Sequence, residues 1–166
     1  LTYDGWTFTW QAGRQLASMV KTGTNASFKY DANGLRIQKT VNGVVTDYTL
    51  HGKLVTHLKQ GGDNLHFFYD AQSRPAMVNF NGTIYTYAHN MQGDIVAIVD
   101  SDGAKVVEYK YDTWGKPLDG YPTGTLKDTL GKLSPFRYKG YVYDEDTALY
   151  YLRSRYYSPV WERFIN

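Results

Sequence analysis

The feature that most constrains the fold of this chain is a short internal repeat. Units built around Tyr-Asp stand at residues 28–37 (FKYDANGLRI), 68–77 (FYDAQSRPAM) and 110–118 (KYDTWGKPL). Weaker copies before and between these units bring the aligned positions to Trp10, Tyr30, Leu50, Tyr69, His89 and Tyr111. The gaps between those positions, obtained by subtraction, are 20, 20, 19, 20 and 22 residues. Repeats made of two helices need about 33 residues or more. Two strands of about five to seven residues with two turns fill the available length. The period therefore predicts β-hairpins.

Two kinds of turn alternate along the repeats. In the clear units an aspartate follows the tyrosine, as at Asp31, Asp70 and Asp112, and its side chain can accept hydrogen bonds from nearby backbone amides. Gly34 and Gly115 then supply a position that tolerates positive φ. The second kind is Asn-Gly or Asp-Gly, at residues 42–43, 81–82 and 102–103, which is the strongest short-range hairpin signal. The sequence thus predicts an all-β chain, a spiralling strip of antiparallel β-hairpin repeats with no substantial helix.

Composition agrees with this fold and excludes several functions. The chain has 16 Tyr, which suits pleated strands, and no Cys, so disulfides and thiolate chemistry are absent. Its net charge of +2 does not indicate a nucleic-acid partner. No apolar run approaches the roughly 20 residues of a membrane span. The N-terminal Leu1 carries neither an initiator Met nor a signal peptide, so we expect an internal piece of a longer protein.

We expect three regions. Residues 1–118 carry the hairpin repeats, residues 119–134 form an irregular loop rich in Gly, Pro, Thr and Lys, and residues 135–166 form a distinct strand–turn–strand segment. The repeats expose sheet edges, so self-association through these edges is also expected.

The last region resembles a known family. Residues 135–164 read PFRYKGYVYDEDTALYYLRSRYYSPVWERF, which is similar to the Rhs repeat-associated core segment, and the Tyr-Asp-x-x-Gly units are similar to YD repeats. The resemblance assigns structural roles to the repeat residues Tyr30, Asp31, Gly34, Tyr69, Asp70, Tyr111, Asp112 and Gly115. It assigns motif positions in the terminal segment to Arg137, Tyr138, Gly140, Tyr143, Asp144, Tyr150, Tyr151, Arg153, Arg155, Tyr156 and Tyr157.

The resemblance to the Rhs/YD-repeat family implies a fold and a function. Such repeats wind into a hollow shell, and the terminal segment ends the shell. The shell encloses or presents a C-terminal toxin for bacterial competition or virulence, as part of a secreted or cell-surface protein. The implied partners are neighbouring YD repeats and the toxin, and no cofactor is implied. Some members cleave themselves, so an aspartate-dependent self-cleaving terminus is the alternative.

For self-cleavage the candidate residues are Asp144 and Arg155. The sequence departs from the family pattern at Ser158, where the family has Asp, and at Glu162 and Ala148, where it has Gly. A neutral hydroxyl cannot replace a carboxylate as a general base at pH 7. We therefore expect a non-catalytic structural module.

Several smaller features are assigned structural roles. Asp144, Glu145 and Asp146 are read as a solvated acidic turn, and Arg153 and Arg155, which share one side, could hold Asp144. The repeated aromatic residues are read as a packed ladder, and the alternative is a surface module that binds glycans or wall polymers.

Metal binding is not expected. The four histidines, His51, His57, His66 and His89, lack the spacing of a metal site, and residues 100–103 are read as a turn rather than a calcium loop.

Overall fold

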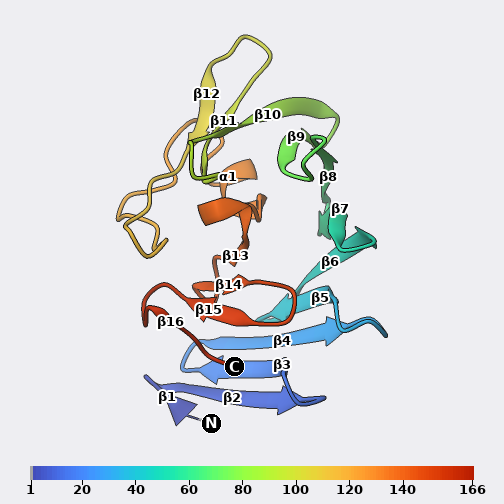
Figure 1. Cartoon of the computed structure of the whole chain (residues 1–166), viewed down its shortest axis with the longest axis vertical. Helices are drawn as coiled ribbons and strands as arrows, with labels where there is room; N and C mark the ends of the chain where they lie inside the picture. Colours follow the sequence, from blue (N-terminus) through green and yellow to red (C-terminus); the bar gives the residue numbers. More distant parts are fainter. Residues whose placement is uncertain (1) are drawn as a thin grey trace.

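The computed structural model describes residues 2–166 and is almost entirely β-structure. Twelve strands form one antiparallel sheet in which every strand pairs with its neighbours in sequence (Figure 1). These strands are β1 (Thr2–Tyr3), β2 (Trp6–Gln11), β3 (Gln15–Lys21), β4 (Thr24–Tyr30), β5 (Arg36–Val41), β6 (Val44–His51), β7 (Leu54–Gln60), β8 (Asp63–Tyr69), β9 (Pro75–Phe80), β10 (Thr83–His89), β11 (Ile95–Val99) and β12 (Lys105–Glu108). We call this sheet the repeat strip. The predicted all-β fold of antiparallel hairpins is confirmed.

The Asn-Gly turns have the geometry that their residues favour. Val41 pairs with Val44, so only Asn42 and Gly43 lie between β5 and β6, and both have positive φ (49° and 84°). This backbone matches the right-handed twist of the two strands that it joins. The same turn joins β9 to β10 through Asn81 and Gly82.

Five further turns share one arrangement of hydrogen bonds. In each, the first residue is Asp or Asn, and its Oδ1 atom accepts the backbone N–H groups two and four residues later at 2.8–3.0 Å. These first residues are Asp31, Asp70, Asn90, Asp100 and Asp112. Residues 100–103 therefore form a turn of this type.

The tyrosine before the turn joins one hairpin to the previous one. The hydroxyl groups of Tyr30, Tyr69 and Tyr111 donate to backbone carbonyl oxygens 14 to 16 residues earlier, in the preceding repeat. The Tyr69 hydroxyl reaches the Val55 oxygen at 2.5 Å, for example. Where the repeat has His89 instead, the imidazole Nε2 is buried without a hydrogen-bond partner among the described residues.

The strip curves, and the rest of the chain lies on its concave side (Figure 1). Residues 119–134 include a short helix, α1 (Leu130–Leu133), whose Leu130 side chain is fully buried. A 3-10 turn, η1 (Tyr138–Gly140), follows. A second antiparallel sheet contains β13 (Val142–Asp144), β14 (Leu149–Tyr151), β15 (Tyr156–Ser158) and β16 (Arg163–Phe164). We call residues 135–166 the terminal segment. The expected strand–turn–strand there is thus a four-stranded sheet, and the three-region division stays a prediction.

Two hydrophobic clusters join the terminal segment to the inner face of the strip. In one, the Phe136 ring packs edge-on against Phe67, Tyr69 and Tyr87, with ring centroids 4.9, 6.1 and 6.0 Å away. In the other, Leu149 and Tyr156 pack with residues of β2–β5. No helix in residues 2–166 has the length and apolar character needed to cross a bilayer.

Tyr69 tests this packing. We expect Tyr69→Ala to lower the free energy of unfolding by about 3–5 kcal/mol, because a large, mostly buried ring is lost. Tyr69→Phe, which removes only the hydroxyl, should cost about 1 kcal/mol. Urea denaturation followed by tryptophan fluorescence measures both. The control is Phe68→Ala on the outer face, where the side chain is 45% exposed and the loss should be smaller. A Tyr69→Ala loss below about 1 kcal/mol would contradict the ladder.

Candidate functional site

The candidate site is the interface between the terminal segment and the inner face of the strip. In five hairpins, two residues spaced three apart near the start of the second strand point inward, because a β-bulge interrupts the alternation of the strand. In four repeats these two residues are apolar: Leu16 and Met19, Val55 and Leu58, Pro75 and Val78, and Ile95 and Ile98. In the remaining repeat they are Arg36 and Lys39, which we call the basic pair. Both are nonetheless buried, with 3% and 8% of their surface exposed.

The basic pair meets one carboxylate of the terminal segment. Arg36 Nη1 and Nη2 donate to the two oxygens of Asp144 at 2.5 and 2.9 Å, a bidentate pair. Lys39 Nζ lies 3.4 Å from Asp144 Oδ1 and 3.1 Å from Asp146 Oδ2. Asp144 itself is only 1% exposed. A buried carboxylate is therefore fully engaged by two cations.

Aromatic rings complete the surroundings of Arg36. Its guanidinium carbon lies 5.4, 5.1 and 4.6 Å from the ring centroids of Phe28, Tyr48 and Tyr151. The Arg36 backbone N–H also donates to the Tyr151 hydroxyl at 2.9 Å. These rings exclude water while their faces attract the cation.

Charge and burial oppose each other in this cluster. Burial disfavours the ionised form of Asp144, but the attraction of Arg36 and Lys39 outweighs it, so the pKa of Asp144 is lowered. Burial likewise disfavours the charged forms of Arg36 and Lys39, yet Asp144 raises the pKa of both above their ordinary values. All three groups are charged at neutral pH.

The partner that sequence reasoning gave Asp144 was wrong. Arg153 and Arg155 are exposed and form no ion pair within residues 2–166. The Arg155 guanidinium instead lies 4.0 Å from the ring centroid of Phe164. The reading of a solvated acidic turn holds for Glu145 and Asp146, which are exposed, and fails for Asp144, which is buried.

Three tyrosine hydroxyls hold the last Tyr-Asp turn. Tyr138, Tyr157 and Tyr150 donate to three successive backbone oxygens, those of residues 113, 114 and 115, at 3.1, 3.0 and 2.8 Å. Gly115 has a φ of 87°, and a Cβ atom placed there would lie 2.5 Å from the Tyr138 ring. Glycine is thus required both for the turn and for the approach of the terminal segment.

A third attachment lies at the turn before β11. The Ile95 N–H donates to the Arg137 oxygen at 3.1 Å, and the Lys139 N–H donates to Asp94 Oδ1 at 2.8 Å. The Arg137 side chain is buried, with its guanidinium 4.2 Å from the Tyr109 ring centroid and 2.8 Å from Glu145 Oε1.

Other motif positions of the terminal segment take part in strand pairing, a turn and a hydrogen bond. Tyr143 is buried and pairs with Tyr150 across β13 and β14, while Gly140 has positive φ (70°) in the turn before them. The Tyr156 hydroxyl lies 2.7 Å from that of Tyr30. Because Tyr30 gives its hydrogen to the Leu16 oxygen, Tyr156 is the donor of that bond. Burial raises the pKa of Tyr30 to about 12, so its hydroxyl stays protonated.

The departures from the family pattern have local consequences. Ser158 is buried, and its Oγ accepts the Trp161 N–H at 3.1 Å, so the position serves a turn. Ala148 and Glu162 adopt φ of 55° and 54°, the left-handed region in which glycine is least strained.

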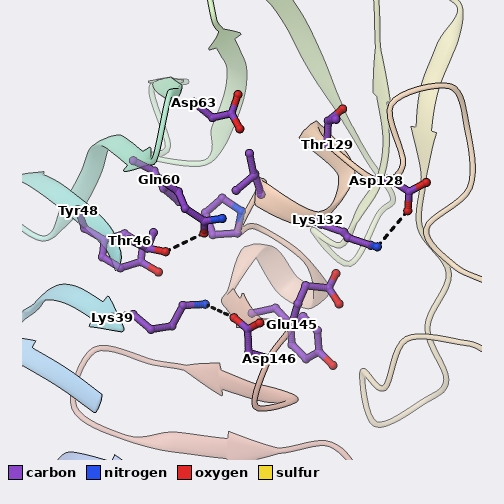
Figure 2. Close-up of a pocket in the computed structure, with 14 residues that line it drawn as sticks. Lys39, Thr46, Tyr48, Gln60, Asp63, Asp128, Thr129, Lys132, Glu145 and Asp146 are labelled. Atoms are coloured by element: carbon purple, nitrogen blue, oxygen red, sulfur yellow. Dashed lines mark hydrogen bonds and ion pairs between the residues drawn. The ribbon is translucent and has the colours of Figure 1, made fainter. Parts of the chain in front are cut away.

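Arg36, Lys39, Asp144 and Asp146 form what we call the ion cluster. A pocket of about 290 Å³ borders this cluster (Figure 2). Figure 2 shows Lys39 extending from the left toward Asp146, whereas Lys132, on α1, points to the right toward Asp128. Residues 2–166 contain no group of three or more His, Asp or Glu side chains arranged to hold a metal ion. His57 and His66 stack on adjacent strands with centroids 4.2 Å apart.

Comparisons place this architecture among known proteins. The tRNA nuclease WapA of Bacillus subtilis (strain 168) is 41% identical over 95% of this chain, and the tRNA3(Ser)-specific nuclease WapA of Bacillus spizizenii is 40% identical over the same share. The crystal structures of TcdB2-TccC3-Cdc42 and TcdB2-TccC3 match with TM-scores of 0.73 and 0.68, at 17% and 18% identity over 96% and 97% of the chain. No family profile matches.

The chain belongs to the Rhs/YD-repeat family. It spans about 7% of the length of the two WapA relatives and 9% of each of the two matched structures. It is thus a segment of a WapA-like YD-repeat protein with the fold of the matched TcdB2-TccC3 segment.

Sequence reasoning missed the basic pair within this YD-repeat segment. Its signal is present: alignment of the repeats puts Arg36 and Lys39 in columns that are otherwise apolar. Two cations in a core column require a buried counter-charge elsewhere in the chain.

Asp144→Asn tests the ion cluster. The substitution leaves Arg36 buried without its counter-charge, so we expect a loss of about 3–5 kcal/mol in the free energy of unfolding, measured by urea denaturation. The triple variant Arg36→Leu, Lys39→Met, Asp144→Leu copies the apolar residues of the first repeat and should lie within about 2 kcal/mol of the wild type. A loss below about 1 kcal/mol for Asp144→Asn would show that the pair does not hold the terminal segment.

The lowered pKa of Asp144 also predicts how stability depends on pH. A carboxyl whose folded pKa lies below its unfolded value of about 3.9 stabilises fully above that value and loses its contribution as pH falls through the folded pKa. We expect the difference in unfolding free energy between wild type and triple variant to stay constant from pH 5 to 8 and to shift against the wild type below about pH 4. Urea midpoints at stepped pH measure it, and a constant difference down to pH 2 would contradict the assignment.

Proposed function

We propose that this chain is a non-catalytic wall segment of an Rhs/YD-repeat shell that encloses or presents a C-terminal toxin, within a secreted or cell-surface protein. The observation that carries the proposal is the buried attachment of Asp144 to the basic pair, which fixes the terminal segment on the concave side of the strip. A shell needs such an attachment, because a curved sheet alone leaves its inner apolar face in water.

The position of Asn166 supports an inward path. Its Nδ2 atom donates to the backbone oxygens of Arg14 and Ser154 at 2.9 and 3.2 Å, between the strip and the terminal segment. A polypeptide that continues from this residue would begin on the concave side, where a shell would hold its cargo.

The chemistry of the site favours a structural role. A general base must have a free lone pair within reach of the proton that it removes. Asp144 is buried and its two oxygens bind Arg36, with Lys39 beside them, so no substrate proton lies within its reach and the two cations lower its basicity. The other candidate position holds Ser158, a neutral hydroxyl bonded to the backbone. The nuclease activity in the names of the WapA relatives belongs, in this proposal, to other parts of those proteins.

Limited proteolysis of the full-length parent protein tests the enclosure. With the wild type we expect the region after the shell to resist protease, and with Asp144→Asn to be cut at a protease concentration at least about tenfold lower, because each 1.4 kcal/mol lost from the attachment raises the open population tenfold. The triple apolar variant is the matched control and should protect like the wild type.

Two results would contradict the proposal. If Asp144→Asn and the wild type resist protease equally, the attachment of Asp144 does not protect the region after the shell. A discrete fragment that forms without protease, and is absent from Asp144→Asn, would support the self-cleaving terminus instead.

A further inference from the structure

A second pocket lies between the turns of the strip and the terminal segment, and Arg36 is the one residue that it shares with the ion cluster of Asp144 and Asp146. It has a volume of about 420 Å³. Its apolar lining comes from both sides, with Leu50 and Val55 from the strip and Phe136, Val142 and Leu152 from the terminal segment. These apolar residues form the floor of the pocket, which can receive one or two apolar side chains.

The rim of this pocket is basic and uncompensated. Lys53, Arg153 and Arg155 line it and are exposed, and no Asp or Glu is among its lining residues. None of the three forms an ion pair with a carboxylate of residues 2–166. The fourth cation of the lining, Arg36, is already neutralised by Asp144. The opening therefore has an excess of positive charge above an apolar floor.

The backbone of the rim is strained. Arg153 has a φ of 63°, which is unfavourable for a long side chain. A tight turn around it is closed by the Leu152 N–H to the Arg155 oxygen at 2.8 Å and by the Ser154 N–H to the Leu152 oxygen at 2.7 Å. Strain of this kind persists where the surroundings or a function require it, and here the turn places both arginines at the same opening.

We propose that this pocket binds an extended acidic peptide segment, with an apolar side chain in the floor and flanking carboxylates on Arg153, Arg155 and Lys53. Guanidinium groups bind carboxylates in a bidentate manner, and the apolar floor gives affinity that an inorganic anion could not use. The proposal rests on the pocket alone and holds whether or not the shell encloses a toxin.

Fluorescence anisotropy tests the proposal with the chain as it exists. The probe is a fluorescein-labelled peptide of alternating Leu and Glu, and the matched control peptide has Gln in place of every Glu. We expect saturable binding of the Glu peptide that weakens as salt is raised, and at least about tenfold weaker binding of the Gln peptide, equivalent to 1.4 kcal/mol.

Variants separate the pocket from general surface charge. Arg153→Gln and Lys53→Gln should each weaken binding about tenfold. Lys127→Gln removes the same charge at an exposed position outside the pocket lining and should change nothing. Arg153→Gly removes the charge and relieves the positive φ, so it should weaken binding while urea stability stays equal or rises. The readout of folding is thus independent of binding.

The proposal fails if the two peptides bind equally, or if Arg153→Gln and Lys127→Gln have the same effect. It also fails if inorganic phosphate or a sulfated sugar displaces the peptide at concentrations equal to the peptide's dissociation constant, since the site would then recognise charge without the apolar group.

Discussion

The buried pair of Arg36 and Asp144 is the interaction on which the arrangement of the rest depends. Removing two full charges from water costs several kcal/mol per ion, and only good geometry repays it. Here that geometry consists of a bidentate contact, a second cation at Lys39 and three aromatic rings. The pair also selects a position. The inner faces of neighbouring repeats are alike and apolar, so packing alone would allow the terminal segment to dock one repeat earlier or later. Because the charges occur in a single repeat, they remove that ambiguity. We infer that the ion pair stands in the core because it fixes the repeat on which the terminal segment docks.

Tyrosine also joins separate elements throughout the YD-repeat segment. Its ring packs in the core while its hydroxyl donates a hydrogen bond to a backbone carbonyl. Within the strip, Tyr30, Tyr69 and Tyr111 bond the preceding hairpin. In the terminal segment, other tyrosines bond the carbonyl oxygens of the last turn. Phenylalanine would supply the same packing and leave these oxygens without donors, which explains why the composition favours Tyr over Phe by 16 to 7.

The parts of the fold that follow from local chemistry could be read from the sequence. The period near 20 residues and the alternating Asp and Asn-Gly turns predict a meander, because each hairpin is specified by its own residues. Contacts between distant residues could not be read in the same way. Arg36 and Asp144 are 108 positions apart, and the nearby Arg153 and Arg155 offered a plausible but wrong partner. The informative signal was a departure from the repeat rather than the repeat itself, namely two cations in an apolar column.

The turns of the terminal segment show what this attachment permits. Lys139, Ala148, Arg153 and Glu162 all have positive φ, although glycine is least strained there. Each such residue costs of order 1 kcal/mol, and it persists only where surrounding contacts over-determine the backbone. The ion cluster, the tyrosine hydroxyls and the backbone bonds to Arg137 and Lys139 provide those contacts at three separate places, namely β5, the Asp112 turn and the turn before β11. The terminal segment can therefore vary at its own turns, whereas Gly115, against which Tyr138 packs, has no room to change.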